Sequence, residues 1–155
     1  MASTLTASTL TVAITESIEL NGKDQGGSNV LTIGSIATIS KRIIDVPASE
    51  VTIIAISTAV ANGTFIEGDV RYIRITNLDD TNHVTLTFKD EDSTEFAVKL
   101  DKGQSFIYNG DLSGGVVDTM HAGGSALTVS LNDLVDITAI ADTAACDIEV
   151  FVASA

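Results

Sequence analysis

The chain lacks tryptophan altogether, and its 155 residues include one cysteine, one proline, five phenylalanines and two tyrosines. The lone Cys146 excludes an internal disulfide and any zinc site built from clustered cysteines. Carbohydrate-binding proteins usually present exposed aromatic platforms, and only Tyr72 and Tyr108 are obvious candidates for one. The sequence therefore offers little support for a lectin-like role.

Basic residues are also scarce, since 8 lysines and arginines stand against 21 acidic residues and give a net charge of −13. No lysine or arginine follows Lys102, whereas seven acidic residues do. Proteins that bind nucleic acids draw most of their affinity from cations that contact phosphates, and anionic membranes attract the same cations. The charge balance therefore disfavours both nucleic acid and membrane as partners.

Long apolar runs are missing as well. The first fifteen residues have neither a basic segment nor a continuous apolar one, so they do not resemble a secretory signal. The densest apolar stretch, residues 51–60, is only ten residues long, and a membrane-spanning helix needs about 20. We expect a protein that is made in the cytoplasm without a signal peptide.

β-Branched residues dominate what is present: 17 isoleucines, 14 valines and 19 threonines make up 50 of the 155 residues. Their side chains are stiff and fit a pleated sheet better than a helix. Charged residues are only 19% of the chain, which excludes disorder as its overall state. The composition predicts an all-β protein with one domain in residues 10–155, preceded by an N-terminal arm in residues 1–9.

Alternation of apolar and polar residues locates the strands and their buried faces. The clearest patterns are Val84/Leu86/Phe88, Phe96/Val98/Leu100 and Ile148/Val150/Val152. Residues 70–109 read as an antiparallel meander with one wet face, and residues 51–58 as a central buried strand. Residues 134–145 fit either a strand or a short helix. We expect about nine to ten strands in an antiparallel two-sheet sandwich, similar to a jelly roll.

The N-terminus carries a perfect tandem repeat, in which residues 2–6 and residues 7–11 both read Ala-Ser-Thr-Leu-Thr. Because strand side chains alternate with period two, the repeat places Leu5 on the face opposite to Leu10. Residues 2–6 therefore cannot continue the first strand into the same core. Either they are a frayed end, or they lie against a neighbouring subunit, and we expect a truncation that starts at Ser8 to weaken assembly and leave the fold intact.

No motif for catalysis or cofactor binding is present. Neither His83 nor His121 has a nucleophile motif such as G-x-S-x-G beside it, and the phosphate-binding glycine motifs are absent. Cys146 shares the phase of Ile148 and Val150, which is typical of a small buried hydrophobic residue. We therefore expect a non-enzymatic protein with no catalytic residue and no cofactor.

Two acidic loops leave calcium binding open. Asp79-Asp80 and the run Asp90-Glu91-Asp92 with Glu95 are rich in carboxylate oxygens, the ligands that Ca²⁺ prefers. The run that begins at Asp90 lacks the third ligand, the glycine and the final glutamate of an EF-hand loop. Solvated acids in hairpin loops are the ordinary case, so no metal ligand is predicted.

Three segments carry a resemblance to a known family. They are Val70-Arg71-Tyr72-Ile73-Arg74-Ile75-Thr76-Asn77-Leu78-Asp79, a hairpin through Val84-Thr85-Leu86, and Phe96-Ala97-Val98-Lys99-Leu100-Asp101-Lys102-Gly103-Gln104-Ser105-Phe106. They resemble small β-rich virion proteins of tailed bacteriophages, particularly marine ones, with an I-x-N-L-D strand end and L-x-x-G-x-S before an aromatic strand. The resemblance covers about forty residues, and any meander of this kind needs a similar pattern. It implies a structural component of the particle.

Two hypotheses follow. The first is a capsid decoration protein that oligomerises and bridges capsomers by binding the major capsid protein or another virion protein. By analogy with such proteins we expect a trimer. A tail or fibre component is the alternative within this class. The second is a β-module that binds a glycan or a host surface through loops such as residues 109–125. The candidate interface residues are Ala2, Ser3, Thr4, Leu5 and Thr6, which would contact a subunit or the particle, and Tyr72 and Tyr108, which a binding module would use.

Overall fold

The computed structural model describes residues 5–110, 117–118 and 132–155, and every regular element among them is a β-strand. No helix in these residues is long and apolar enough to cross a membrane. In chain order the strands are β1 (Ser8–Glu16), β2 (Glu19–Leu20), β3 (Lys23–Asp24), β4 (Gly27–Ile36), β5 (Thr38–Val46), β6 (Val51–Ser57), β7 (Thr64–Ile66), β8 (Val70–Asn77), β9 (Val84–Asp90), β10 (Glu95–Leu100), β11 (Ser105–Asn109), β12 (Val117–Asp118), β13 (Asn132–Ala141) and β14 (Cys146–Ser154).

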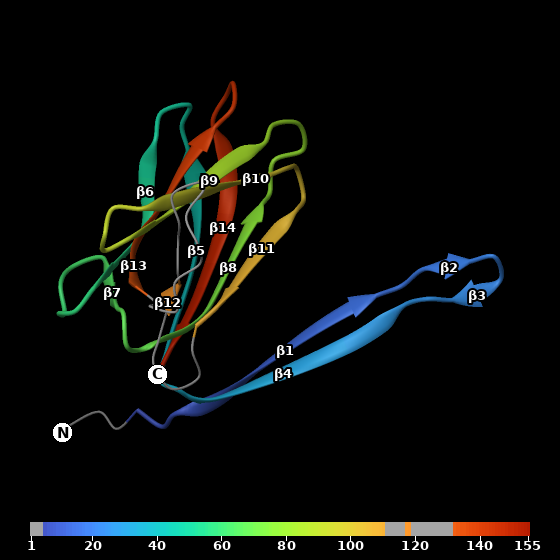
Figure 1. The fold of residues 1–155 in the computed structure, drawn as a ribbon, viewed down its shortest axis with the longest axis horizontal. Coiled ribbons are helices and arrows are strands. Elements are labelled where there is room, and N and C mark those ends of the chain that lie inside the picture. Colours follow the sequence, from blue (N-terminus) through green and yellow to red (C-terminus); the bar gives the residue numbers. More distant parts are fainter. Residues whose placement is uncertain (1–4, 111–116, 119–131) are drawn as a thin grey trace.

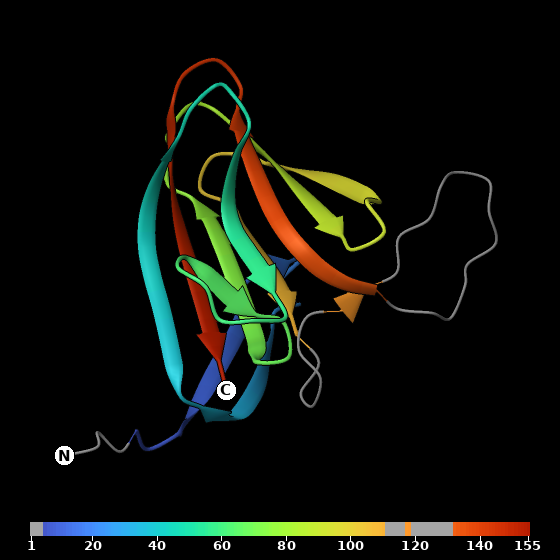
Figure 2. The ribbon, with the colours of Figure 1, turned by 90° about the vertical axis from the view of Figure 1, so that its left-hand side faces the viewer.

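Two sheets face each other as a sandwich, which confirms the expected fold class (Figures 1 and 2). One sheet has the order β10-β9-β13-β6-β7, with β12 paired to β13, and the other has the order β11-β8-β14-β5. All pairs are antiparallel except β6 with β7, which is parallel. The strands β1 and β4 belong to neither sheet, because they pair with each other and project from the sandwich (Figure 1).

The core lies between the two sheets, where period-two alternation places it. Val84, Leu86 and Phe88 of β9 have no exposed surface, and the alternating residues of β14 that begin at Cys146 are equally buried. Burying such side chains contributes roughly 1.5–3 kcal/mol each. The predicted phases of β9 and β14, and the prediction that Cys146 is a buried hydrophobic residue, are therefore confirmed.

A group of aromatic rings joins the two sheets. The Phe88 ring of β9 stacks on Phe96 of β10 with centroids 4.7 Å apart and an interplanar angle of 4°. Two rings of β11 approach Phe88 from the opposite sheet, Phe106 at 5.0 Å and Tyr108 at 5.7 Å. Pairs of this kind contribute about 0.5–1.5 kcal/mol beyond the area that they bury. Four of the seven aromatic residues are thus used to hold the sandwich together.

The predicted meander in residues 70–109 is wrong. β8 lies in one sheet, the chain crosses to the other sheet for the β9–β10 hairpin, and it returns as β11 to pair with β8. The crossing is fixed by Asn77, whose side-chain amide donates to the carbonyls of Asn82 and Leu100 across the two connections. Alternation shows that one face of each strand is buried, but it does not show in which sheet the strand lies.

Other predictions need correction or refinement. Ten of the described strands have five residues or more, as expected, but two of them, β1 and β4, lie outside the sandwich. The boundary placed after residue 9 falls inside β1, because the projecting segment continues to Ile36.

Residues 134–145, left open between strand and helix, supply most of β13. The segment 51–58 forms β6 between β13 and β7, with Ile53 and Ile54 buried and Thr52 exposed.

Candidate functional site: the hairpin arm and the outer face

The feature that sets this sandwich apart is a long hairpin, residues 8–36, which we call the hairpin arm (Figure 1). β1 and β4 pair antiparallel, so that Leu10 lies opposite Ile33 and Val12 opposite Leu31. Because side chains on a strand alternate, these four residues share one face of the two-stranded ribbon. The arm therefore has one apolar face and one face rich in threonine.

The tip of the arm has a specific turn. Asn21 and Gly22 both have positive φ, +53° and +73°, as the two-residue turn of a tight hairpin requires. A side chain at Gly26 would place its Cβ 2.3 Å from the backbone oxygen of Glu16, so only glycine fits there. The Gly26 N–H donates to the Asp24 carboxylate at 2.8 Å. The sequence thus specifies the tip without the help of a partner.

A bulge marks the base of the arm. Ser8 pairs with Ile36 and Leu10 with Ile33, so β4 carries one extra residue at this point, and Ser35 there has φ +60°. The bulge redirects the chain into the sandwich. The next residue, Ala37, donates its N–H to the Ser154 carbonyl at 2.9 Å.

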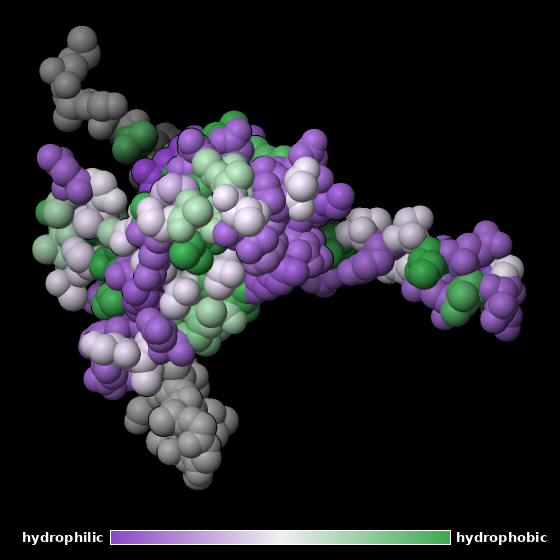
Figure 3. Space-filling view, turned by 90° about the horizontal axis from the view of Figure 1, so that it is seen from above, coloured by the Kyte–Doolittle hydropathy of each residue, from purple (hydrophilic) through white to green (hydrophobic). Residues whose placement is uncertain are grey.

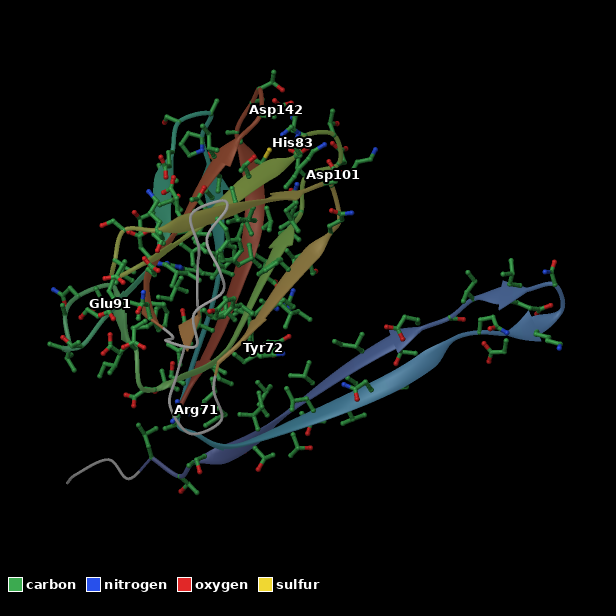
Figure 4. All side chains as sticks on the ribbon, viewed as in Figure 1. Arg71, Tyr72, His83, Glu91, Asp101 and Asp142 are labelled. Carbon is green, nitrogen blue, oxygen red and sulfur yellow. The ribbon has the colours of Figure 1, made fainter. Side chains whose placement is uncertain are left out.

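The base of the arm packs on the outer face of the β11-β8-β14-β5 sheet, which is the face turned away from the core. Tyr72, Ala153, Ile33 and Ile36 are buried in this contact. The half-buried residues around them are Leu10, Val12, Leu31, Ile107 and Phe151. Figure 4 shows Tyr72 on the side of the sheet that faces the arm. We call Tyr72, Ile107, Phe151 and Ala153 the arm seat.

Two rings shape the arm seat. The Tyr72 ring meets Phe151 edge-on, with centroids 6.0 Å apart and an interplanar angle of 73°. Burial raises the pKa of Tyr72, and the nearby Arg74 only partly offsets this effect. A shallow groove of about 330 Å³ separates the arm from the sheet here and is lined by these three side chains and by residues 10–14.

Beyond the arm seat, the apolar face of the arm continues without cover. The exposed fraction is 42% for Ile14, 56% for Ile18 and 59% for Leu20, and Val30 on the other face is 58% exposed. Figure 3 shows hydrophobic side chains at the end of the arm, far from the sandwich. A two-stranded ribbon alone is at best marginally stable in water, so an arm of this length is typical of a segment that a second surface covers.

The outer face of the same sheet is also only partly covered. On β5, Ile39 and Ile43 point outward and are 58% and 64% exposed. Between this edge and the arm seat lies an ion-pair network in which Glu149 accepts from Arg74 at 2.5 Å and from Lys41 at 3.1 Å. The hydrogen bond from Arg74 is the main cause that lowers the pKa of Glu149, and the bond from Lys41 adds to it.

An acidic cleft of about 410 Å³ lies at the far end of β5. Its lining residues are Asp45, Leu78, Asp79, Asp80, Ala145 and Asp147. Asp45 and Asp147 face each other directly across the β5–β14 pair, an arrangement of like charges that destabilises a sheet. The Asp79 carboxylate accepts the N–H groups of Asn82 at 2.6 Å and Thr81 at 2.7 Å, and these bonds lower its pKa.

In the acidic loop that follows β9, the carboxylate of Asp90 stabilises the loop itself. The Asp90 side chain is 2% exposed and accepts hydrogen bonds from the N–H and hydroxyl of Thr94 and from the amide of Asn132. Burial, the largest single influence, raises the pKa of Asp90, but these hydrogen bonds together lower it. Within residues 5–110 and 132–155 no group of three or more acidic, histidine or cysteine side chains is arranged to hold a metal ion.

The sequence-predicted contact residues do not gather at one place. Leu5 and Thr6 are exposed next to the base of the arm, whereas Ala2, Ser3 and Thr4 lie outside the described residues. Tyr72 is 4% exposed beneath the arm of its own chain, and Tyr108 packs against the core. His121 and most of the loop 109–125 also lie outside the described residues.

His83 directly precedes β9. Its Nδ1 lies 3.6 Å from the Asp142 carboxylate, and Figure 4 shows the two side by side at one end of the sandwich. The Cys146 thiol is buried, and burial, with acidic neighbours, raises its pKa. A thiol in such surroundings is a poor nucleophile.

Sequence reasoning missed the arm beyond residue 9 and the exposed pair Ile39 and Ile43. A signal for the arm was present: Asn21-Gly22 is the strongest short-range indicator of a hairpin, and threonine-rich alternating segments flank it. Comparison of the chain with protein-family models, with curated proteins and with solved structures found no match. The resemblance to virion proteins therefore stays a hypothesis.

Proposed function

We propose that this chain is a non-enzymatic structural protein of a virus particle, most concretely a decoration protein that oligomerises and bridges capsomers on the exterior of a phage head. The observation that carries this proposal is the hairpin arm, which extends from the sandwich and leaves Ile14, Ile18 and Leu20 uncovered. An apolar projection of this kind is typical of a protein whose stable form includes a neighbour.

The rest of the molecule supports an assembly role more than ligand binding. The acidic cleft contains no metal-binding group among the described residues. In the acidic loop after β9, the Asp90 carboxylate is used to stabilise the turn. Tyr72 is covered by the arm and Tyr108 stacks against Phe88, so neither tyrosine offers the open ring face that a glycan platform needs. The phage resemblance of residues 70–106 supplies the particle as the setting.

Mass spectrometry of purified particles tests the proposal. A decoration protein should be present in a fixed, high copy number relative to the major capsid protein. It should also be released without loss of the tail, which separates it from a tail or fibre component. Absence of the chain from purified particles would overturn the proposed function.

A further inference from the structure

The outer face of the β11-β8-β14-β5 sheet is a surface that binds this hairpin, and only part of it is occupied. The chain's own arm covers the arm seat on β11, β8 and β14. The neighbouring β5 side remains exposed. On β5, Ile39 lies directly beside the buried Ala153, and Ile43 lies beside Glu149 of the ion-pair network. The uncovered part therefore presents two apolar side chains, Ile39 and Ile43, with Lys41 between them.

A second groove connects the two parts. It measures about 330 Å³ and is lined by Ile39 on β5, by Ile36 and Ala37, and by Thr6 and the first residues of β1. It therefore begins at the base of the chain's own arm. The arm of the same chain cannot fill it, because that arm leaves the sandwich at this point and extends away (Figure 1).

The spacing of groups along the arm matches the spacing along β5. Ile14 and Ile18 are four residues apart, and Leu20 follows two residues later. Lys23 pairs with Leu20 across the hairpin, so Lys23 lies at the same distance along the arm as Leu20. Ile39 and Ile43 are also four residues apart, and Asp45 follows two residues later. In extended chains these steps correspond to about 13 Å and about 7 Å. Both surfaces thus present two apolar groups with a charge between them, Glu16 on the arm and Lys41 on β5, and a further charge at the end.

The charges at the ends of the two surfaces, Lys23 on the arm and Asp45 on β5, have opposite signs. Lys23 is the only basic residue among the first forty and lies at the exposed tip of the arm. Asp45 faces Asp147 and shares the acidic cleft with Asp79 and Asp80, so this end of β5 gains most from a cation. In a chain with a net charge of −13, two copies repel each other, but the arm, with three acidic residues and Lys23, has a net charge of only −2 and approaches another copy with little repulsion.

We propose that the hairpin arm of one chain lies along β5 of a second copy, with Ile14 and Ile18 against Ile39 and Ile43 and with Lys23 at the acidic cleft of Asp45 and Asp147. This inference rests on the assembly role proposed above and names its partner. The contact joins two different surfaces, so copies associate head to tail and close into a ring if the rotation permits. A ring of three fits the trimer expected from the resemblance.

Cross-linking between variants tests the contact. Ile18→Cys and Ile43→Cys chains are prepared separately, mixed, and treated with a short bis-maleimide, which tolerates a small error in register. Cys146 is fully buried and does not compete. The mixture should give a dimer band that neither variant gives alone, and the chain that carries both changes should give a ladder or a closed ring. Val60→Cys replaces Ile43→Cys in the control mixture: Val60 is 83% exposed and lies near Thr38, whose side chain points to the opposite face of β5 from Ile39 and Ile43.

Two results would overturn the contact. One is cross-linking of Ile18→Cys with itself as efficient as in the mixture, which would mean that arms meet arms. The other is a dimer band no stronger than in the Val60→Cys control. Mass spectrometry of particles decides the proposed function separately: a chain that is present in particles but fails to cross-link leaves the structural role intact and removes a second copy as the partner.

A charge exchange gives an independent readout. Lys23→Glu and Asp45→Lys should each weaken self-association about fivefold or more, and a chain with both changes should recover part of that loss. Lys99→Glu, on the outer face of the other sheet, alters net charge by the same amount as Lys23→Glu and should have little effect. If Lys99→Glu weakens association as much as Lys23→Glu, the effect is general repulsion and the proposed register is wrong.

Discussion

Asp90 and Asp136 are two partly or fully buried carboxylates that the fold treats in opposite ways. Asp90 accepts hydrogen bonds from Thr94 and Asn132, and its pKa is lowered. Asp136 on β13 has a buried Oδ1 for which the described residues provide no hydrogen-bond partner. Burial raises the pKa of Asp136, and attraction to Lys89 offsets only part of that effect. One carboxylate therefore stabilises the native state when ionised, and the other destabilises it.

We expect Asp90→Asn and Asp136→Asn to change stability with opposite signs at neutral pH. Asp90→Asn should cost about 2 kcal/mol, because hydrogen bonds to a charged acceptor are lost. Asp136→Asn should gain about 1 kcal/mol, because it removes a partly buried charge that the attraction to Lys89 compensates only in part. Urea unfolding of both variants and the wild type, followed over pH, measures the two effects.

The dependence on pH distinguishes the two causes. The lowered pKa of Asp90 means that its stabilisation is complete above the ordinary aspartate pKa of about 3.9 and is lost as the pH falls through the lower folded value. The raised pKa of Asp136 means that its destabilisation is complete above the raised value and disappears as the pH falls below about 3.9. Effects of equal sign, or effects independent of pH, would contradict this assignment.

A second pair of substitutions tests the strand phase of β9. Leu86→Asp should cost more than about 3 kcal/mol, because Leu86 has no exposed surface and the new carboxylate would be unpaired in the core. Thr85→Asp should cost less than about 1 kcal/mol, since Thr85 faces outward opposite Lys99 on β10. The midpoint of urea unfolding measures both, and similar losses from the two variants would show that the phase is wrong.

At the scale of elements, the hairpin arm and the sandwich are separate units joined at the arm seat. Only the base of the arm is buried, by Tyr72 and its neighbours, whereas β14 pairs along its whole length with β5 and β8. Local opening free energies follow such differences in buried contacts. The arm should therefore open before the sandwich does.

Tyr72→Ala should detach the arm and leave the sandwich folded. The substitution removes the edge-on contact with Phe151 and leaves a cavity under Ile33, at a cost of about 3 kcal/mol. Hydrogen exchange should accelerate in residues 8–36 and change little in β14. Tyr108→Ala is the control, because it removes a ring from the core and should lower protection of the sandwich itself. An arm equally protected in Tyr72→Ala and wild type would contradict the role of the arm seat.

Much of the sandwich was predictable from local pattern, because period two in residues such as Val84, Leu86 and Phe88 requires one buried face. β8 and β11 lie at the two ends of residues 70–109, the segment in which alternation predicted strands. The pairing of strands was not predictable in the same way: the turn after Asn77 allows a hairpin or a crossing, and the difference depends on contacts with distant residues such as Leu100. Long-range pairing is information that alternation does not contain.

The site was less accessible than the fold for a related reason. Leu10 and Val12 alternate like residues of any sandwich strand, and alternation does not reveal whether the covering surface is the chain's own sheet or a neighbour. The out-of-phase Leu5 directed attention to residues 2–6 and gave no sign of the hairpin arm in residues 8–36. The exposure of Ile39 and Ile43 depends on the position of β5 at a sheet edge, which is a property of the complete topology.

At the scale of the whole molecule, a compact acidic sandwich carries one arm with an apolar face and a net charge of only −2. The negative charge keeps copies apart over most of the surface, and the arm with the β5 side of the outer face supplies the places where attraction exceeds repulsion. This division is the physical basis of the proposed assembly role. It predicts association that strengthens with added salt, because screening weakens the repulsion between two chains of net charge −13 more than it weakens the attraction of the single Lys23, and it leaves the apolar contact intact.

Sedimentation equilibrium of the intact protein at micromolar concentration, in low and in moderate salt, tests this account most directly. The account predicts a mass that is an integral multiple of 16.1 kDa, with a trimer as the expected species, and a shift toward it as salt is added. A single species of 16.1 kDa at every protein and salt concentration would contradict the claim that the hairpin arm joins copies of this chain.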